Sequence, residues 1–242
     1  MNFLQKIKDR LDLVRPFAQE FINIELFSQL NTTITHFIYE LIQNAEDAHS
    51  SLITIQLEKD RLIFSNNGKC FTESNTKSLI KLGYSDKGEE DIGKFGIGFK
   101  SVFSVSECPE VYSGKLSFRF LKQLEIEAIE SESYVKGSRF VIPFDEERHP
   151  VNETFEFLKK ELEEIDPLVI MFLKHIHEIK WQTDDTKGTI SKSDRQTIKS
   201  KTGQLAKSIR ITSSVSKNES SNDSDKIDLN FLVFKSFVSE NI

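Results

Sequence analysis

The segment ELIQNAEDA, residues 40–48, is the stretch from which the fold of this chain can be argued. It completes a longer run whose apolar side chains recur every three or four residues, the spacing of an amphipathic helix. Those side chains are Ile34, Phe37, Ile38, Leu41, Ile42 and Ala45. Asn31 and Thr32 precede the run and suit a helix N-cap. The sequence therefore predicts a helix over residues 31–48.

Three polar residues share one face of this predicted helix. Glu40, Asn44 and Asp47 are four and seven residues apart, and these spacings return to the same side of a helix. An asparagine oxygen suits Mg²⁺, whose other ligands can be phosphate oxygens and waters. A glutamate one turn earlier can orient and deprotonate an attacking water. A solvated helix face shows the same spacing, so the interpretation depends on other segments.

The glycine-rich segment GKFGIGFKSVF, residues 93–103, is the second feature. Gly93, Gly96 and Gly98 permit close approach of the backbone to a ligand. The apolar residues that follow suit the start of a helix, whose N–H groups bind phosphate, and Lys94 adds positive charge. The glycine spacing is that of neither a Rossmann nor a Walker A loop. A tight turn for helix packing is the alternative interpretation.

Two more polar segments have a similar character. FSNNGKCF, residues 64–71, directly follows a strand-like run, and a side-chain carbonyl at a strand end can accept from an adenine amino group. LGYSDKG, residues 82–88, is typical of a loop, in which Ser85 and Lys87 can reach phosphates. An Asn-Gly turn without a ligand and a solvated loop are the alternatives.

The rest of the sequence is mainly strand-like. LITIQL (52–57) and RLIFS (61–65) predict a hairpin. A helix is expected over about 73–82. Several strands follow between 109 and 144, and then a helix over 151–165, after which DPLVIMFLKH (166–175) is expected to continue as a second helix. Further strands are expected in a Ser-, Thr- and Lys-rich C-terminal part. This order predicts an α+β fold, a two-layer sandwich of helices on a mixed, mostly antiparallel sheet.

Taken in order, these segments resemble the ATP-binding domain of the gyrase, heat-shock-chaperone, histidine-kinase and MutL (GHKL) ATPase superfamily. ELIQNAEDA resembles its N-box, FSNNGKCF its G1 box and LGYSDK its lid segment. DIGKFGIGFKSVFSVSECPEVYSG resembles its G2 box, and KGSRFVIPF its last box. The resemblance covers roughly residues 30–145 and is closest to the heat-shock-chaperone and sacsin-like branch. It implies the Bergerat ATP-binding fold.

The resemblance also implies roles for individual residues. Glu40 would be the general base and Asn44 the Mg²⁺ ligand. The nucleotide-binding residues would be Asn44, Asp47, Asn66, Gly68, Ser85, Lys87, Gly93, Lys94, Phe95, Gly96, Ile97, Gly98 and Ser138. Asn66 stands where the family usually has an aspartate that reads adenine. Cys70 replaces the second glycine of the G1 box, which weakens the expected site or relaxes its base selectivity.

The predicted organisation has three parts. Residues 1–30 would form an N-terminal helical extension, and residues 31–182 the ATP-binding core. Residues 183–242 would add strands to the same domain, with a mobile loop near 216–226. The function implied is that of an ATPase domain of a larger protein, in which ATP-Mg²⁺ binding and slow hydrolysis gate lid closure or homodimerisation. The alternative is a nucleotide-binding or degenerate interaction module without hydrolysis.

Composition limits the other classes. The net charge of −6 argues against nucleic acid over the whole surface. Residues 186–217 carry eight Lys or Arg and one Asp, which keeps a weak case for nucleic-acid contact. No apolar run approaches the roughly 18 residues of a membrane span, and no signal-peptide core follows the N-terminus. Cys70 and Cys108 suit a reducing compartment, so a cytoplasmic protein with no membrane contact is predicted.

Overall fold

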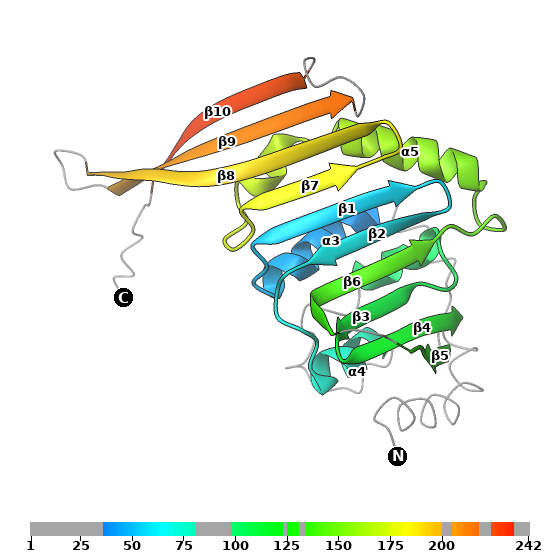
Figure 1. The fold of residues 1–242 in the computed structure, drawn as a ribbon. Coiled ribbons are helices and arrows are strands. Elements are labelled where there is room, and N and C mark those ends of the chain that lie inside the picture. The colour runs from blue at the N-terminus through cyan, green and yellow to red at the C-terminus, as the bar shows by residue number, and fades with distance from the viewer. Residues whose placement is uncertain are drawn as a thin grey trace, which may run out of the picture.

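The computed structural model describes residues 36–80, 98–122, 125–130, 134–199, 205–217 and 224–234 (Figure 1). Its strands are β1 Leu52–Glu58, β2 Arg61–Asn66, β3 Glu110–Gly114, β4 Leu116–Lys122, β5 Glu125–Ala128, β6 Val135–Pro143, β7 Glu178–Gln182, β8 Thr186–Lys199, β9 Leu205–Lys217 and β10 Ser224–Phe234. Its α-helices are α3 His36–Asp47, α4 Glu73–Ile80 and α5 Val151–Glu163, and its 3-10 helices are η1 Gly98–Ser104 and η2 Pro167–Ile170. The strands form one sheet in the order β10-β9-β8-β7-β1-β2-β6-β3-β4-β5.

The middle of the sheet is built around β1. This strand pairs antiparallel with β2 and parallel with β7, and the other described pairs are antiparallel. Its side chains alternate, with Ile53 and Ile55 buried and Thr54 and Gln56 exposed. Alternation of this kind buries one face of a sheet and leaves the other polar. The buried face is the one that the helices cover (Figure 1).

Aromatic side chains fill much of the space between the sheet and η1. The Phe99 ring lies 5.6 Å from that of Phe140 and 5.8 Å from that of Phe120, measured between centroids. Phe103 meets Phe120 edge-on at 5.3 Å. Each of these side chains is almost completely buried, and burial of a phenylalanine stabilises a fold by roughly 2 kcal/mol. This cluster holds the start of η1 against β6.

The two-layer sandwich of helices on a sheet is wrong for this chain, and with it the Bergerat-fold assignment. The described residues form mostly one large mixed sheet of ten strands with few helices. The physical reason is strand length at the C-terminal end. The polar alternation in 186–199 and 205–217 produces long strands that join the same sheet. In Figure 1, β8 and β9 extend well beyond α3 and α5, so the helices do not make a second layer over the whole sheet.

The predicted positions of individual helices and strands agree better with the structure than the predicted architecture does. The hairpin, α4 and α5 lie where the sequence predicted them, and α3 falls inside the helix predicted over 31–48. A helix expected after residue 165 is instead the short η2, where Asp166 accepts from the Leu168 N–H and Pro167 follows the cap. Residues 1–30 and most of the loop predicted near 216–226 lie outside the described residues.

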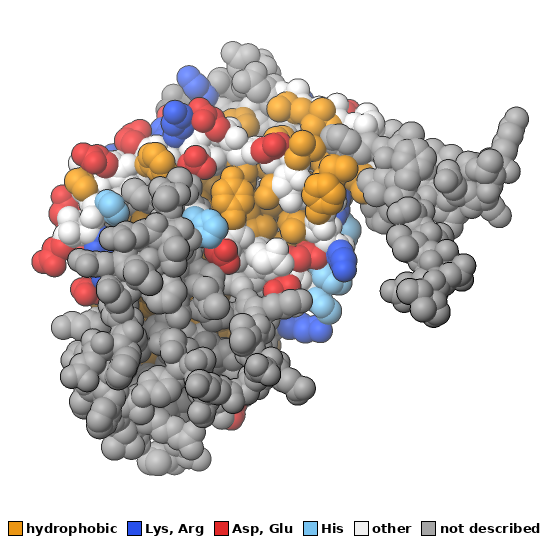
Figure 2. All heavy atoms as spheres, turned by 180° about the vertical axis from the view of Figure 1, so that it is seen from behind, with side chains coloured by type: hydrophobic (Ala, Val, Ile, Leu, Met, Phe, Trp, Pro, Cys, Tyr) orange, Lys and Arg blue, Asp and Glu red, His pale blue; other side chains and the backbone are white. Residues whose placement is uncertain are grey.

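Hydrophobic side chains gather on the helix-covered face, between acidic ones (Figure 2). The exposed large side chains from α3, α5 and the η2 region are Tyr39, Phe157, Leu168 and Phe172. Partial burial, followed by the charges of Glu161 and Asp166, raises the pKa of Tyr39, which locates that ring near the end of α5. In the described part of the chain, no helix has the length and apolar character needed to cross a membrane.

Candidate functional site

The helix α3 carries the first group of predicted site residues. Asn44 is buried, at 8% exposed, whereas Glu40 and Asp47 are half-buried. One Glu40 oxygen lies 3.1 Å from His36 Nε2, and the Glu40 side chain is 32% exposed. Asp47 accepts a long hydrogen bond of 3.4 Å from Gln43 on the helix surface. Of the three predicted residues on this helix, Asn44 is therefore the one that lies deepest in the fold.

The C-terminal end of α3 has a Schellman arrangement. The Ser50 N–H donates to the Ala45 carbonyl and the His49 N–H donates to the Glu46 carbonyl, both at 2.9 Å. His49 occupies the left-handed position, with φ of 58°. This ending turns the chain into β1 and presents the Ala48 carbonyl to the segment that follows β2.

The turn after β2 is bound to that helix end. The Lys69 N–H donates to the Ala48 carbonyl at 2.8 Å, and the Gly68 N–H donates to Asn66 Oδ1 at 3.0 Å. A Cβ on Gly68 would lie 2.7 Å from the Ala48 oxygen, so only glycine fits this approach. The predicted residues Asn66 and Gly68 are therefore held close to α3, one helical turn beyond Asn44.

Asn67 strengthens the same connection, although the sequence had suggested no role for it. Its Oδ1 accepts from the N–H groups of Ser51 and Leu52 and from the Ser50 hydroxyl, at 2.9–3.0 Å. The two consecutive asparagines thus have different functions. Asn67 binds the backbone N–H groups at the start of β1. The Nδ2 of Asn66, in contrast, has no hydrogen-bond partner among the described residues.

Ser138 lies beside Asn66. The two residues are direct partners in the β2–β6 ladder, and their side chains share the face that carries Phe64 and Phe140. Both are buried, with 2% exposure for Ser138 and 7% for Asn66. The Ser138 hydroxyl lies 2.9 Å from that of Ser113. The hydroxyl and the amide therefore stand side by side on the helix-covered face of the sheet.

Of the three predicted glycines in the segment 93–98, Gly98 is the one that the structure describes. It begins η1, which packs against α3. The next residue, Phe99, packs on Phe140, two residues along β6 from Ser138. The end of the glycine-rich segment therefore packs against both α3 and β6. The remaining predicted residues lie outside the described part of the chain: Ser85, Lys87, Gly93, Lys94, Phe95, Gly96 and Ile97.

The Cys70 side chain contacts the start of β6 and the residue that precedes it. Its Sγ lies 3.4 Å from the Tyr134 hydroxyl and donates to the Val135 carbonyl at 3.7 Å. The hydrogen bond with Cys70 raises the pKa of the Tyr134 hydroxyl. A Cβ on Gly114 would touch Cys70 at 3.4 Å, so the thiol fills the corner between the turn, β3 and β6.

Glu46 is a structurally important residue of this helix that sequence reasoning missed. Its carboxylate is buried and accepts from the backbone N–H groups of Lys174, His175 and Ile176, at 2.6–3.1 Å. Burial would raise the pKa of Glu46, but these backbone donors outweigh it and hold the pKa below its ordinary value. Glu46 is separated from these three donors by 128 to 130 positions in the sequence, so no local pattern reveals the contacts.

Glu46 should make stability depend on pH. Because its pKa is lower in the folded than in the unfolded chain, its contribution is complete above an unfolded pKa of about 4.3 and is lost as pH falls below it. At pH 7, Glu46→Gln should lower the free energy of unfolding by about 2 kcal/mol, since charge-assisted bonds become weaker. Urea unfolding between pH 7 and pH 3 measures this. Wild type should lose more stability on acidification than Glu46→Gln, and parallel pH curves would contradict the assignment.

The described residues contain no group of three His, Cys, Asp or Glu side chains able to hold a metal ion. His175 and His177, which alternate along the chain, therefore belong to no such group. His175 stacks on His49, with ring centroids 4.0 Å apart. Any Mg²⁺ would therefore depend on Asn44 together with ligand oxygens, and the side-chain oxygen of an asparagine suits that use.

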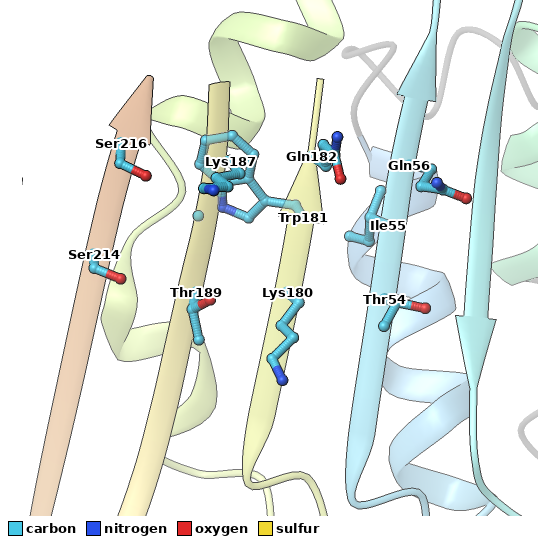
Figure 3. A pocket seen from close by; sticks show the side chains of 11 residues that line it. Thr54, Ile55, Gln56, Lys180, Trp181, Gln182, Lys187, Thr189, Ser214 and Ser216 are labelled. Carbon is cyan, nitrogen blue, oxygen red and sulfur yellow. The ribbon is translucent and has the colours of Figure 1, made fainter. Parts of the chain in front are cut away.

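A shallow hollow on the open face of the sheet is separate from these residues (Figure 3). Its lining comes from β1, β7, β8 and β9 and includes Thr54, Lys180, Gln182, Lys187 and Thr189. None of the predicted site residues lines it. Asn44, Asn66 and Ser138 are buried on the opposite, helix-covered side, so this hollow is not the site that the sequence suggested.

Comparison with known proteins gives one family match. Residues 25–124 match the model of the Sacsin domain. This range includes Glu40, Asn44, Asn66 and Gly98 but ends before Ser138.

Three curated relatives are similar to parts of the chain. Protein NO VEIN of Arabidopsis thaliana is 39% identical over 127 residues, which is 50% of this chain and 4% of that protein. Sacsin of Homo sapiens is 28% identical over 109 residues, 36% of this chain and 2% of that protein. Chaperone protein HtpG of Wigglesworthia glossinidia brevipalpis is 28% identical over 193 residues, 62% of this chain and 29% of that protein. The chain thus spans less than a third of each relative, and the matches support a sacsin-like reading of residues 25–124.

Proposed function

We propose that this chain binds ATP with Mg²⁺ and hydrolyses it slowly, as the ATPase module of a larger protein of the GHKL type. The observation that carries the proposal is the position of Asn44, a largely buried residue on the face of α3 that it shares with Glu40. Gly98 of η1 packs near the same helix, and the Asn66 turn is bonded to its end. These contacts support the proposal, because the residues that we propose for binding the metal, the phosphates and the base lie in one region.

Asn44 and Glu40 would divide the work at the phosphates. Asn44 would hold Mg²⁺ through its side-chain oxygen, and the bound metal would supply charge stabilisation to the phosphates. Glu40, one turn away, would orient and deprotonate the attacking water. His36 engages one Glu40 oxygen at 3.1 Å. This contact fixes the carboxylate and leaves its second oxygen to take the water.

The backbone and side-chain donors of the glycine-rich segment and the lid would complete the phosphate site. Gly93, Gly96 and Gly98 would let N–H groups approach the phosphates, and Lys87 would bring positive charge. At the other end, Asn66 and Ser138 would hold adenine. The carbonyl of Asn66 is an acceptor that can pair with an amino group, although without the charge of a carboxylate.

Calorimetric titration of the purified chain with ATP, with and without Mg²⁺, tests the proposal. We expect saturable binding that Mg²⁺ strengthens, and we expect Asn44→Ala to remove the Mg²⁺ effect. Asn152→Ala, which changes an exposed asparagine on α5, is the matched control and should change nothing. Absence of binding by wild type at millimolar ATP would overturn the proposed function.

A module that binds nucleotide without hydrolysis is the second candidate. The departures at Asn66 and Cys70 favour it, because both lie at the expected base site. Mg²⁺-dependent phosphate release by the purified chain would exclude this reading. Homodimerisation on ATP binding, and contacts with further domains or protein partners, belong to the first proposal, since ATP would order the lid.

The structure weakens the case for nucleic-acid contact through residues 186–217. Lys192 is buried and donates its Nζ to the Leu173 carbonyl, and Arg210 pairs with Asp228. Two of the eight basic side chains in this range are therefore already engaged. The basic count overstated the charge available to a phosphate backbone.

A further inference from the structure

Ser113 of β3 joins three segments around the proposed base site. Its hydroxyl oxygen accepts from the Phe71 N–H at 2.9 Å, donates to the Gly137 carbonyl at 2.7 Å and lies 2.9 Å from the Ser138 hydroxyl. Ser113 is only 1% exposed. It therefore connects the segment after the Asn66 turn with β6, and no residue pattern in the sequence suggested it.

The hydrogen atoms in this cluster can be assigned by counting. A hydroxyl carries one hydrogen and two lone pairs. The Gly137 carbonyl can only accept, so the single hydrogen of Ser113 is used there. The contact between Ser113 and Ser138 must then use the hydrogen of Ser138. Phe71 N–H and Ser138 O–H fill both lone pairs of Ser113.

This assignment determines what Ser138 can offer to a ligand. Having donated its hydrogen to Ser113, the Ser138 oxygen has only lone pairs left. Asn66, its partner across the β2–β6 ladder, accepts the Gly68 N–H at Oδ1 and keeps a second lone pair there. Two acceptors therefore stand side by side, and an exocyclic amino group has two hydrogens.

We infer that Ser113 is a positioning residue that fixes Ser138 as an acceptor and so makes the site select a base with an exocyclic amino group. The inference rests on the proposed function, because it assigns the base-recognition geometry of that same site. A base without the amino group leaves a lone pair unfilled on each of these two buried oxygens, and lost hydrogen bonds at buried acceptors are penalised. The expected preference for ATP over purine riboside triphosphate, which lacks only that group, is about ten- to hundredfold.

Measuring the affinities of both nucleotides by calorimetry in the presence of Mg²⁺ tests this inference. In Ser113→Ala the Ser138 hydroxyl loses the oxygen that accepts its hydrogen, so it can turn that hydrogen toward the ligand and no longer offers only lone pairs; the preference should fall by about tenfold. Ser117→Ala is the matched control, because Ser117 is a buried strand serine whose hydroxyl has no partner among the described residues. It should keep the wild-type preference.

Double substitution separates positioning from general destabilisation. Ser138→Ala should lower the preference as Ser113→Ala does, and the double variant should lower it no further, because both act through one hydroxyl. Ser113→Thr keeps the hydroxyl and should keep the preference. If Ser113→Ala does not fold, Ser113→Cys, of similar size and with a weaker donor, takes its place.

The outcomes distinguish the two levels of the argument. Wild type that binds neither nucleotide overturns the proposed function itself. Wild type that binds ATP no better than purine riboside triphosphate overturns the inference and leaves the proposed function standing. A folded Ser113→Ala, or Ser113→Cys in its place, that keeps the full preference overturns the positioning role.

Discussion

Glu40→Gln should lower ATP turnover by about 10²–10⁴-fold and leave ATP affinity nearly unchanged. Glutamine keeps the size of the side chain and can still contact His36, which lies 3.1 Å from Glu40 in the native chain. It cannot accept the proton of the attacking water. The loss should therefore appear in kcat and not in the affinity for ATP. Phosphate release under saturating ATP and Mg²⁺, together with calorimetric affinity, measures both.

The control for this substitution is Glu156→Gln, which changes an exposed carboxylate on α5 and should leave turnover as in wild type. It separates the role of Glu40 from a general loss of negative charge. Equal turnover in wild type and Glu40→Gln would remove Glu40 as the general base. A turnover loss accompanied by an equal loss of ATP affinity would instead make Glu40 a binding residue.

Gly137→Ala should be the most destabilising single change near the site, lowering the free energy of unfolding by about 3–5 kcal/mol. Gly137 has φ of +79°, which side chains rarely adopt. An added Cβ would lie 2.0 Å from the Asn66 carbonyl oxygen, and backbone cannot move aside as a side chain can. The clash falls on the strand pair that holds Asn66 beside Ser138. Urea unfolding and ATP titration should both show the loss.

Gly114→Ala is a matched control for backbone strain. Gly114 also has a positive φ, of +61°, but its nearest neighbour would be the Cys70 Cβ at 3.4 Å, an ordinary contact. Only the conformational penalty remains, about 1–2 kcal/mol. The difference between the two variants therefore measures the clash with Asn66. If Gly137→Ala were no less stable than Gly114→Ala, the close approach of β6 to the Asn66 turn would be wrong.

The sequence allowed individual candidate site residues to be named, whereas it did not give the architecture of the sheet. Glu40, Asn44 and Asp47 share a helix face because helical geometry follows from spacing alone. Asn66 and Gly68 could be named because a strand followed by Asn-Asn-Gly must turn. Their grouping with Ser138 followed from the resemblance, and their roles remain predictions. The contacts of Asp47 with Gln43 and of Glu40 with His36 are of the same local kind, because residues four positions apart are neighbours on a helix.

Local periodicity in this sequence was sufficient for the hairpin of β1 and β2, for α4 and α5, and for the polar face of α3, because each depends on neighbours within a few positions. The single ten-stranded sheet, which replaced the expected sandwich, arose from pairings between distant strands such as β1 with β7. The same is true of Glu46, which takes N–H groups from residues 174–176, and of Ser113, which joins Phe71 to β6. Hydrogen bonds between distant residues leave no period in a sequence, since any strand edge or polar side chain can make them until packing selects one partner.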